Sequence, residues 1–326
     1  MSDPNIPKTL GALLIGGLFA SLLGGTVNLQ TVSYFRAYQK DRVSVKTLIS
    51  VIWFLDNLHT AFIWASLWLC LIQNYGQEDL VDSIPWCIAL TVMITAVVTF
   101  LVHCFFAHRI FLLSKKNWFI TLPVLALTLL RLVAASVSTW EMLHYRSFTL
   151  FRIHGRWIFT LGLAVSSAVD ILITVFLVYL FRSNRTESGR FNYIFDKLIR
   201  YGLETGSLTC LGTVVTMSCW VTQPQNLIFL GLHVVIGKLY ATSLLVTLNY
   251  RVGMTMSRAS CSQCDQRAPV LFLESRHQKT NSRGYLAGGP SRKIPTELQI
   301  SVETRTSVQF DGKADSVMES AKQEDL

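Results

Sequence analysis

Charge is scarce in this chain, and the shortage is uneven. Only 15% of its 326 residues are charged, whereas a soluble domain carries roughly 25%. The tail from Arg251 onward holds 11 of the 29 Lys and Arg and 9 of the 20 Asp and Glu, so the first 250 residues are poorer still. Together with a mean hydropathy of +0.41, this scarcity excludes an ordinary soluble globular protein and predicts a multi-pass membrane protein.

The signature motifs of common enzyme classes are also missing. The chain has no P-loop, no Gly-x-Ser-x-Gly turn and no glycine pattern of a dinucleotide-binding fold. A zinc hydrolase needs three or four converging ligands, and no His-Glu-x-x-His or paired-histidine spacing supplies them. We therefore expect no metal, no cofactor and no enzymatic activity, with an intramembrane hydrolase as the least favoured alternative.

Cysteine pairing is the third absence. The seven cysteines are scattered, mostly in or beside apolar runs, and form no disulfide framework. Cys261 and Cys264 stand apart in the tail, close to the last apolar run. Because a single Cys-x-x-Cys is a weak zinc signal, we interpret these two as candidate lipidation sites, with free thiols as the alternative.

What the sequence does contain is seven long apolar segments. Runs of more than about 18 residues with few charges indicate transmembrane helices. The sequence thus predicts an all-α, seven-helix transmembrane bundle in residues 1–250 and a disordered cytosolic tail in residues 251–326. The predicted spans are Leu10–Phe35, Thr47–Gln73, Ile84–Leu113, Trp118–Trp140, Arg156–Phe181, Leu198–Thr222 and Asn226–Tyr250.

The basic residues predict the orientation of these spans. Fifteen Lys and Arg fall in the loops on one side and at the start of the tail, against four on the other side. The positive-inside rule then places the N-terminus outside and the C-terminus in the cytosol. The net charge of +9 is explained by loops facing an anionic leaflet, so no nucleic-acid partner is expected.

Small residues form stripes on two of the predicted helices. The first span carries Ala12, Gly16, Ala20 and Gly24 at intervals of four, and the sixth carries a Gly-x-x-x-Gly pattern from Gly202. Such stripes allow close approach of two helix backbones. We expect them to pack helices within the chain, with a homodimer through the Gly/Ala stripes as the alternative.

Ionisable residues lie deep inside the predicted spans, where each costs at least about 2.5–3.5 kcal/mol on insertion scales. With about 1.5 Å of rise per residue, most of them fall in one slab about 18–20 Å above the inner face, and one lies lower, at roughly 9–11 Å. We predict that they line a polar cavity for a ligand or ion. The candidate residues are Asp56, His59, Arg131, Asp170, Glu204 and Lys238.

A structural interpretation of the same layer stays open beside this one. Lys238 and Arg131 would be neutralised by Asp170 and Asp56, which would fix the helix arrangement and do nothing more. A retinal Schiff base on Lys238 is disfavoured, because microbial rhodopsins carry an acidic residue one turn earlier, where this chain has Val234.

Two stretches carry a resemblance to a known family. The last span reads Lys-Leu-Tyr-Ala-Thr-Ser-Leu-Leu-Val-Thr-Leu-Asn-Tyr-Arg over 238–251, and the sixth begins Leu-Ile-Arg-Tyr-Gly-Leu-Glu-Thr-Gly at Leu198. Both resemble multi-pass membrane proteins of mushroom-forming fungi catalogued as domain of unknown function 6534. The resemblance covers about Asp170 to Arg251 and implies a fungal membrane protein, but no activity.

We therefore expect a seven-helix sensor or receptor-like protein with a small-molecule ligand in the mid-membrane cavity. The alternatives are a small-solute, ion or proton transporter, which uses the same layer, and a purely structural membrane protein. The expected surroundings are the lipid bilayer of the plasma membrane or an endomembrane.

Overall fold

The computed structural model describes residues 6–75, 82–183, 189–223 and 226–249, with side chains described from residue 10 and, in the third range, from residue 206. The C-terminal tail with Cys261 and Cys264 lies outside the described residues, and so does the side chain of Glu204.

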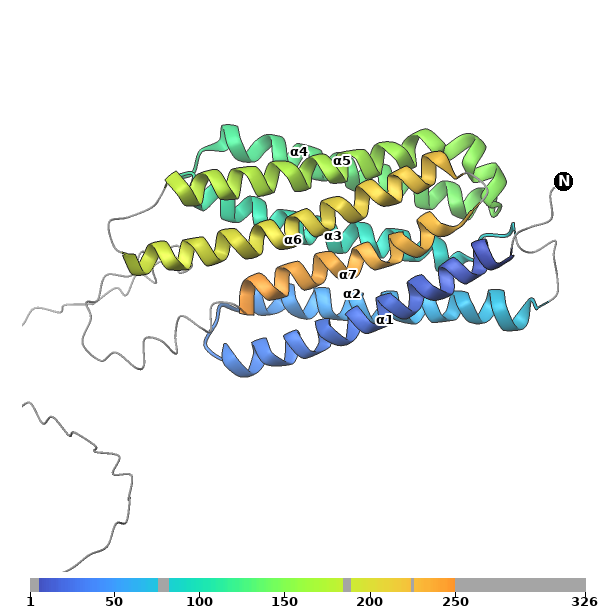
Figure 1. Ribbon diagram of the computed structural model, residues 1–326, viewed down its shortest axis with the longest axis horizontal. Coiled ribbons are helices and arrows are strands. Elements are labelled where there is room, and N and C mark those ends of the chain that lie inside the picture. The colour runs from blue at the N-terminus through green and yellow to red at the C-terminus, as the bar shows by residue number, and fades with distance from the viewer. Residues whose placement is uncertain (1–5, 76–81, 184–188, 224–225, 250–326) are drawn as a thin grey trace, which may run out of the picture. The chain divides into compact units, whose positions relative to one another are not determined.

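The described chain is entirely helical apart from short connections (Figure 1). The prediction of seven helices is confirmed. Six of them are long and apolar enough to cross a membrane. The remaining helix, the sixth along the chain, contributes a shorter apolar stretch, Gly206–Thr222. The helices are α1 (Ile6–Ala37), α2 (Val43–Trp68, continued by the π-helical turn η1, Leu69–Gln73), α3 (Trp86–Leu113), α4 (Trp118–Tyr145), α5 (Phe148–Ser183), α6 (Gly189–Thr222) and α7 (Ile228–Asn249).

Neighbours in sequence are neighbours in the bundle, and α7 closes the ring by packing against α1 and α6. Helix α3 also contacts α5 and α7, so it crosses the interior, and more than half of its apolar window is buried. The outer surface is apolar: Phe119 is 91% exposed and Trp157 67%. Large apolar side chains outside and polar side chains inside are the arrangement that a lipid environment requires.

Helix α5 begins at Phe148, eight residues before the start that the sequence predicts. The carboxylate of Asp82, in the connection before α3, accepts hydrogen bonds from the backbone N–H and the hydroxyl of Thr149. Arg152 and Arg156, which the sequence alone suggests for the loop before this span, therefore lie within α5. The guanidinium of Arg156 donates to the backbone carbonyl of Val221 at the end of α6, and that of Arg152 donates to the backbone carbonyl of Asn226.

The α1 stripe packs against α7 inside the chain. A Cβ atom at Gly16 would overlap the backbone of Gly231, and one at Gly231 would overlap the carbonyl of Ala12. Only glycine permits this approach, which brings the two backbones into direct contact. In α6, Gly206 lies against the side chain of Thr174 on α5. The described glycines of both stripes thus pack against helices of the same chain, and a homodimer through the Gly/Ala stripes stays a prediction.

Candidate functional site

The buried lysine of α7 forms an ion pair with α2. The Nζ atom of Lys238 lies 2.9 Å from Oδ2 of Asp56 and donates to the backbone oxygen of Asp56 and to Oγ1 of Thr60, both at 2.7 Å. All three N–H groups of the ammonium are therefore engaged. Lys238 is completely buried, with 0% of its surface exposed. The pairing of Lys238 with Asp170 that the sequence suggests is wrong.

Helix α1 covers this ion pair. A Cβ atom added to Gly24 would stand 3.6 Å from Lys238 Nζ and 3.7 Å from Asp56 Oδ2. The α1 stripe therefore has a second role: its small residues let α1 pass directly over the charges. Lys238 and Asp56 are 0% and 3% exposed and line none of the three main cavities of the described residues, so the pair is shielded by the surrounding helices.

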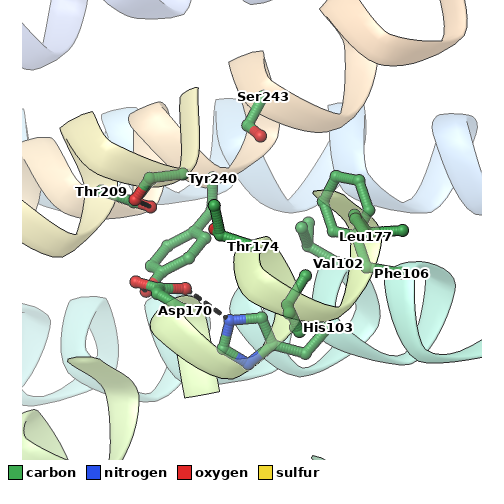
Figure 2. A pocket seen from close by; sticks show the side chains of 11 residues that line it. Val102, His103, Phe106, Asp170, Thr174, Leu177, Thr209, Tyr240 and Ser243 are labelled. Atoms are coloured by element: carbon green, nitrogen blue, oxygen red, sulfur yellow. Dashed lines mark hydrogen bonds and ion pairs between the residues drawn. The ribbon is translucent and has the colours of Figure 1, made fainter. Parts of the chain in front are cut away.

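The second carboxylate makes a different set of contacts. Asp170 of α5 accepts a hydrogen bond from the hydroxyl of Tyr240 on α7 at 2.6 Å, through Oδ2. Its Oδ1 lies 3.1 Å from Nε2 of His103 on α3 (Figure 2). All three side chains are at most 5% exposed. One carboxylate thus connects three helices.

The polar contacts continue from Tyr240 to α4. The hydroxyls of Tyr240 and Ser166 lie 3.0 Å apart, and Nε of Arg131 donates to Oγ of Ser166 at 2.8 Å. The guanidinium also lies over the ring of Tyr240, 5.9 Å from its centroid. We call this chain of His103, Asp170, Tyr240, Ser166 and Arg131 the Asp170 junction. Arg131 belongs to it, so the suggested pairing of Arg131 with Asp56 is also wrong.

The five predicted site residues whose side chains are described therefore divide among separate contacts. Asp56 and Lys238 form one cluster, and Asp170 and Arg131 belong to another. His59 makes a hydrogen bond with Thr95 on α3, Nε2 to Oγ1 at 3.2 Å, and belongs to neither cluster. Glu204 is the sixth, and its side chain lies outside the described residues.

The geometry of α7 explains this division. Positions 238 and 240 are two residues apart, which turns their side chains about 200° from each other around a helix of 3.6 residues per turn. Lys238 consequently meets α2, and Tyr240 meets α3 and α5. Tyr240 was missed in the sequence because tyrosine is not rare in apolar segments. Its signal was its place two residues after an intramembrane lysine.

A small cavity borders the Asp170 junction. Figure 2 shows Asp170, His103 and Tyr240 at one end of it, with Thr209 of α6 near them and Val102, Phe106 and Leu177 at the other end. We call it the Asp170 cavity. Its volume is about 30 Å³, which suffices for about one water molecule. Of the predicted site residues whose side chains are described, only Asp170 lines this cavity, and a ligand-sized cavity shared by them stays a prediction.

The groups at this site support hydrogen bonding and proton transfer. No group of three or more His, Cys, Asp or Glu side chains is placed to hold a metal ion within the part of the chain that the structure describes. His103, Asp170 and Tyr240 supply donors and acceptors that rearrange when a neighbour changes its protonation or a polar molecule intrudes.

The fold and its buried ionisable groups define a multi-pass helical membrane protein. Residues 166–253 match the family of unknown function DUF6534. No curated protein and no solved structure matches the chain. The matched region includes Asp170, Lys238 and Tyr240, whereas their partners on α2, α3 and α4 lie outside it. The match gives neither source nor activity, so the fungal origin stays a prediction.

Proposed function

We propose that the protein is a receptor-like membrane sensor whose responding element is the Asp170 junction. A small polar ligand taken up at the Asp170 cavity competes for the hydrogen bonds that Tyr240 and His103 make with the carboxylate. One observation carries this proposal: a single buried carboxylate connects α3, α5 and α7 at the wall of a polar cavity that α6 completes.

The position of α6 links ligand uptake to a change of conformation. Gly206 and Thr209 of α6 line the cavity, and Gly206 is in close contact with Thr174 of α5. Since the cavity holds about one water molecule, a larger ligand enters only when α6 moves away from α5. A ligand that binds the opened state better shifts the population towards it.

A transporter for a small solute, ion or proton is the alternative. Many transporters bind their substrates where two helices are broken near the middle of the membrane. Here the helices that supply the Asp170 junction, α3, α4, α5 and α7, run unbroken past it. This continuity supports the sensor over a transporter of that kind. A purely structural role is the third hypothesis, and the experiments below separate all three.

Hydrogen–deuterium exchange of the purified protein tests the sensor proposal. Asp170→Asn keeps the size of the side chain but removes its charge, so we expect several-fold faster exchange in Gly206–Thr222 and little change in α1 and α2. Ser136→Ala is the matched control: its hydroxyl is bound within α4, to Leu132 O at 2.8 Å. Equal acceleration in all seven helices would instead indicate a purely structural junction.

Flux measurements in liposomes test the transport alternative. We expect no solute, ion or proton flux above that of protein-free liposomes. If the wild type carried a flux and Asp170→Asn abolished it, the sensor proposal would be rejected in favour of a transporter that uses this carboxylate.

A further inference from the structure

A second cavity borders Arg131. Arg131 and Ser138 of α4 and His233 of α7 provide its polar wall, and Val92, Phe159 and Leu163 are among its apolar lining residues. Its volume is about 20 Å³. We call it the Arg131 cavity. It shares only Arg131 with the junction, and none of its lining residues lines the Asp170 cavity.

Four polar atoms of the residues that line this cavity have no partner in the protein. Nη1 of Arg131, Oγ of Ser138 and both ring nitrogens of His233 are buried without a hydrogen bond. The three side chains are at most 5% exposed. A buried polar group that makes no hydrogen bond costs about 1–3 kcal/mol, and here four such atoms border the same small space. This concentration indicates an occupant that accepts hydrogen bonds.

The charge of the site specifies the occupant further. A guanidinium stays protonated in proteins and carries donors only. Among the described side chains no carboxylate forms a direct ion pair with Arg131, and Asp170 is joined to it only through Tyr240 and Ser166. A charge without a direct countercharge is unfavourable in a membrane interior. An anion in the Arg131 cavity supplies a direct countercharge and accepts from the guanidinium, the hydroxyl and one imidazole N–H.

The size of the cavity selects among anions. A volume of about 20 Å³ suits one small occupant better than phosphate, sulfate or a larger organic anion. Chloride and bromide are single-atom ions, larger than water but smaller than those anions, and the apolar side chains on the rest of the wall suit an ion with weak hydration. We propose that the Arg131 cavity is a binding site for a monovalent halide, with chloride as the physiological ion. This site goes beyond the sensor proposal and does not depend on it.

Thermal unfolding of the purified full-length protein tests the site. Titration with sodium chloride, with sodium gluconate holding the ionic strength constant, should raise the Tm saturably by about 2–4 °C, because a ligand that binds only the folded state stabilises it. Bromide should act like chloride, and gluconate is too large to enter. A wild-type Tm that is the same in chloride and in gluconate would overturn the proposal and leave a bound water as the occupant.

Matched variants show whether a chloride effect arises at this cavity. Ser138→Ala and His233→Phe each remove unpartnered polar atoms while keeping most of the side-chain volume, and we expect both to shift the chloride midpoint at least several-fold upward. Ser136→Ala, whose hydroxyl is bound to Leu132 O within the same helix, should keep the wild-type midpoint. An unchanged midpoint in both Ser138→Ala and His233→Phe would place the effect elsewhere and refute the site.

Discussion

The Lys238–Asp56 pair and the Asp170 junction use similar groups in opposite ways. Both join helices through a carboxylate that is at most 5% exposed. The ammonium of Lys238 has all of its donors engaged and is covered by α1 at Gly24. Two cavities border the junction, the Asp170 cavity and the Arg131 cavity. The first arrangement fixes α2 to α7, whereas the second leaves room for a change of partner.

The difference shows what makes a buried charge available for function. Burial is nearly equal at the two sites, so it does not separate them. What separates them is the space beside the charge and the state of its hydrogen bonds. A saturated pair without space has a single arrangement, whereas a chain of hydroxyl, carboxylate and imidazole groups beside a cavity has several.

The strongest test of this comparison removes the lysine. Lys238→Met leaves the carboxylate of Asp56 buried without a partner, so we expect a loss of about 3–5 kcal/mol of stability and a greatly reduced yield of folded protein. Thermal unfolding in detergent measures the loss. The double variant Lys238→Met/Asp56→Leu should recover most of it, whereas Lys238→Met/Asp170→Asn should not. Equal recovery by the two double variants would contradict the pairing.

The next test adds a side chain to α1 beside the Lys238–Asp56 pair. Gly24→Leu drives a side chain towards Lys238 Nζ, and overpacking of this kind costs about 1–3 kcal/mol. Gly25→Leu adds the same residue to the same helix at a position with no neighbouring atom within 4 Å. We expect Gly24→Leu alone to lower the Tm. If both variants melted alike, α1 would not cover the pair as described.

A smaller loss is expected when the junction loses one donor. Tyr240→Phe removes the hydroxyl that donates to Asp170 at 2.6 Å, at a cost of about 1.5 kcal/mol for a hydrogen bond to a charged group. The decisive readout is local: exchange in Gly206–Thr222 should accelerate more than exchange in α2. An effect confined to the global Tm would remove the distinction between the junction and the ion pair.

The sequence alone predicted the helices of this protein but not the contacts between them. Length and hydropathy predicted the seven helices, because a membrane imposes one solution on long apolar runs. The depth of Lys238 and Asp170 was inferred from the rise per residue and stays a prediction. Their partners did not follow from the sequence, because pairing depends on how each helix is rotated about its axis. The role of Asp82 at the start of α5 was not predicted, because it depends on a contact with Thr149, which is distant in sequence. The contact of Tyr240 with Asp170 likewise joins two distant segments.

The smallest predicted effect concerns His59, which lies in neither cluster. Thr95→Val removes the hydroxyl that meets His59 Nε2 at 3.2 Å while keeping the size of the side chain. Neutral hydrogen bonds between membrane helices average about 0.6 kcal/mol, so the Tm should fall only slightly. Exchange in Gly206–Thr222 should stay at the wild-type rate, because Thr95 borders neither the Asp170 cavity nor the Arg131 cavity. If α6 responded to Thr95→Val as it does to Tyr240→Phe, His59 would belong to the junction, and the two regions would act as one coupled network.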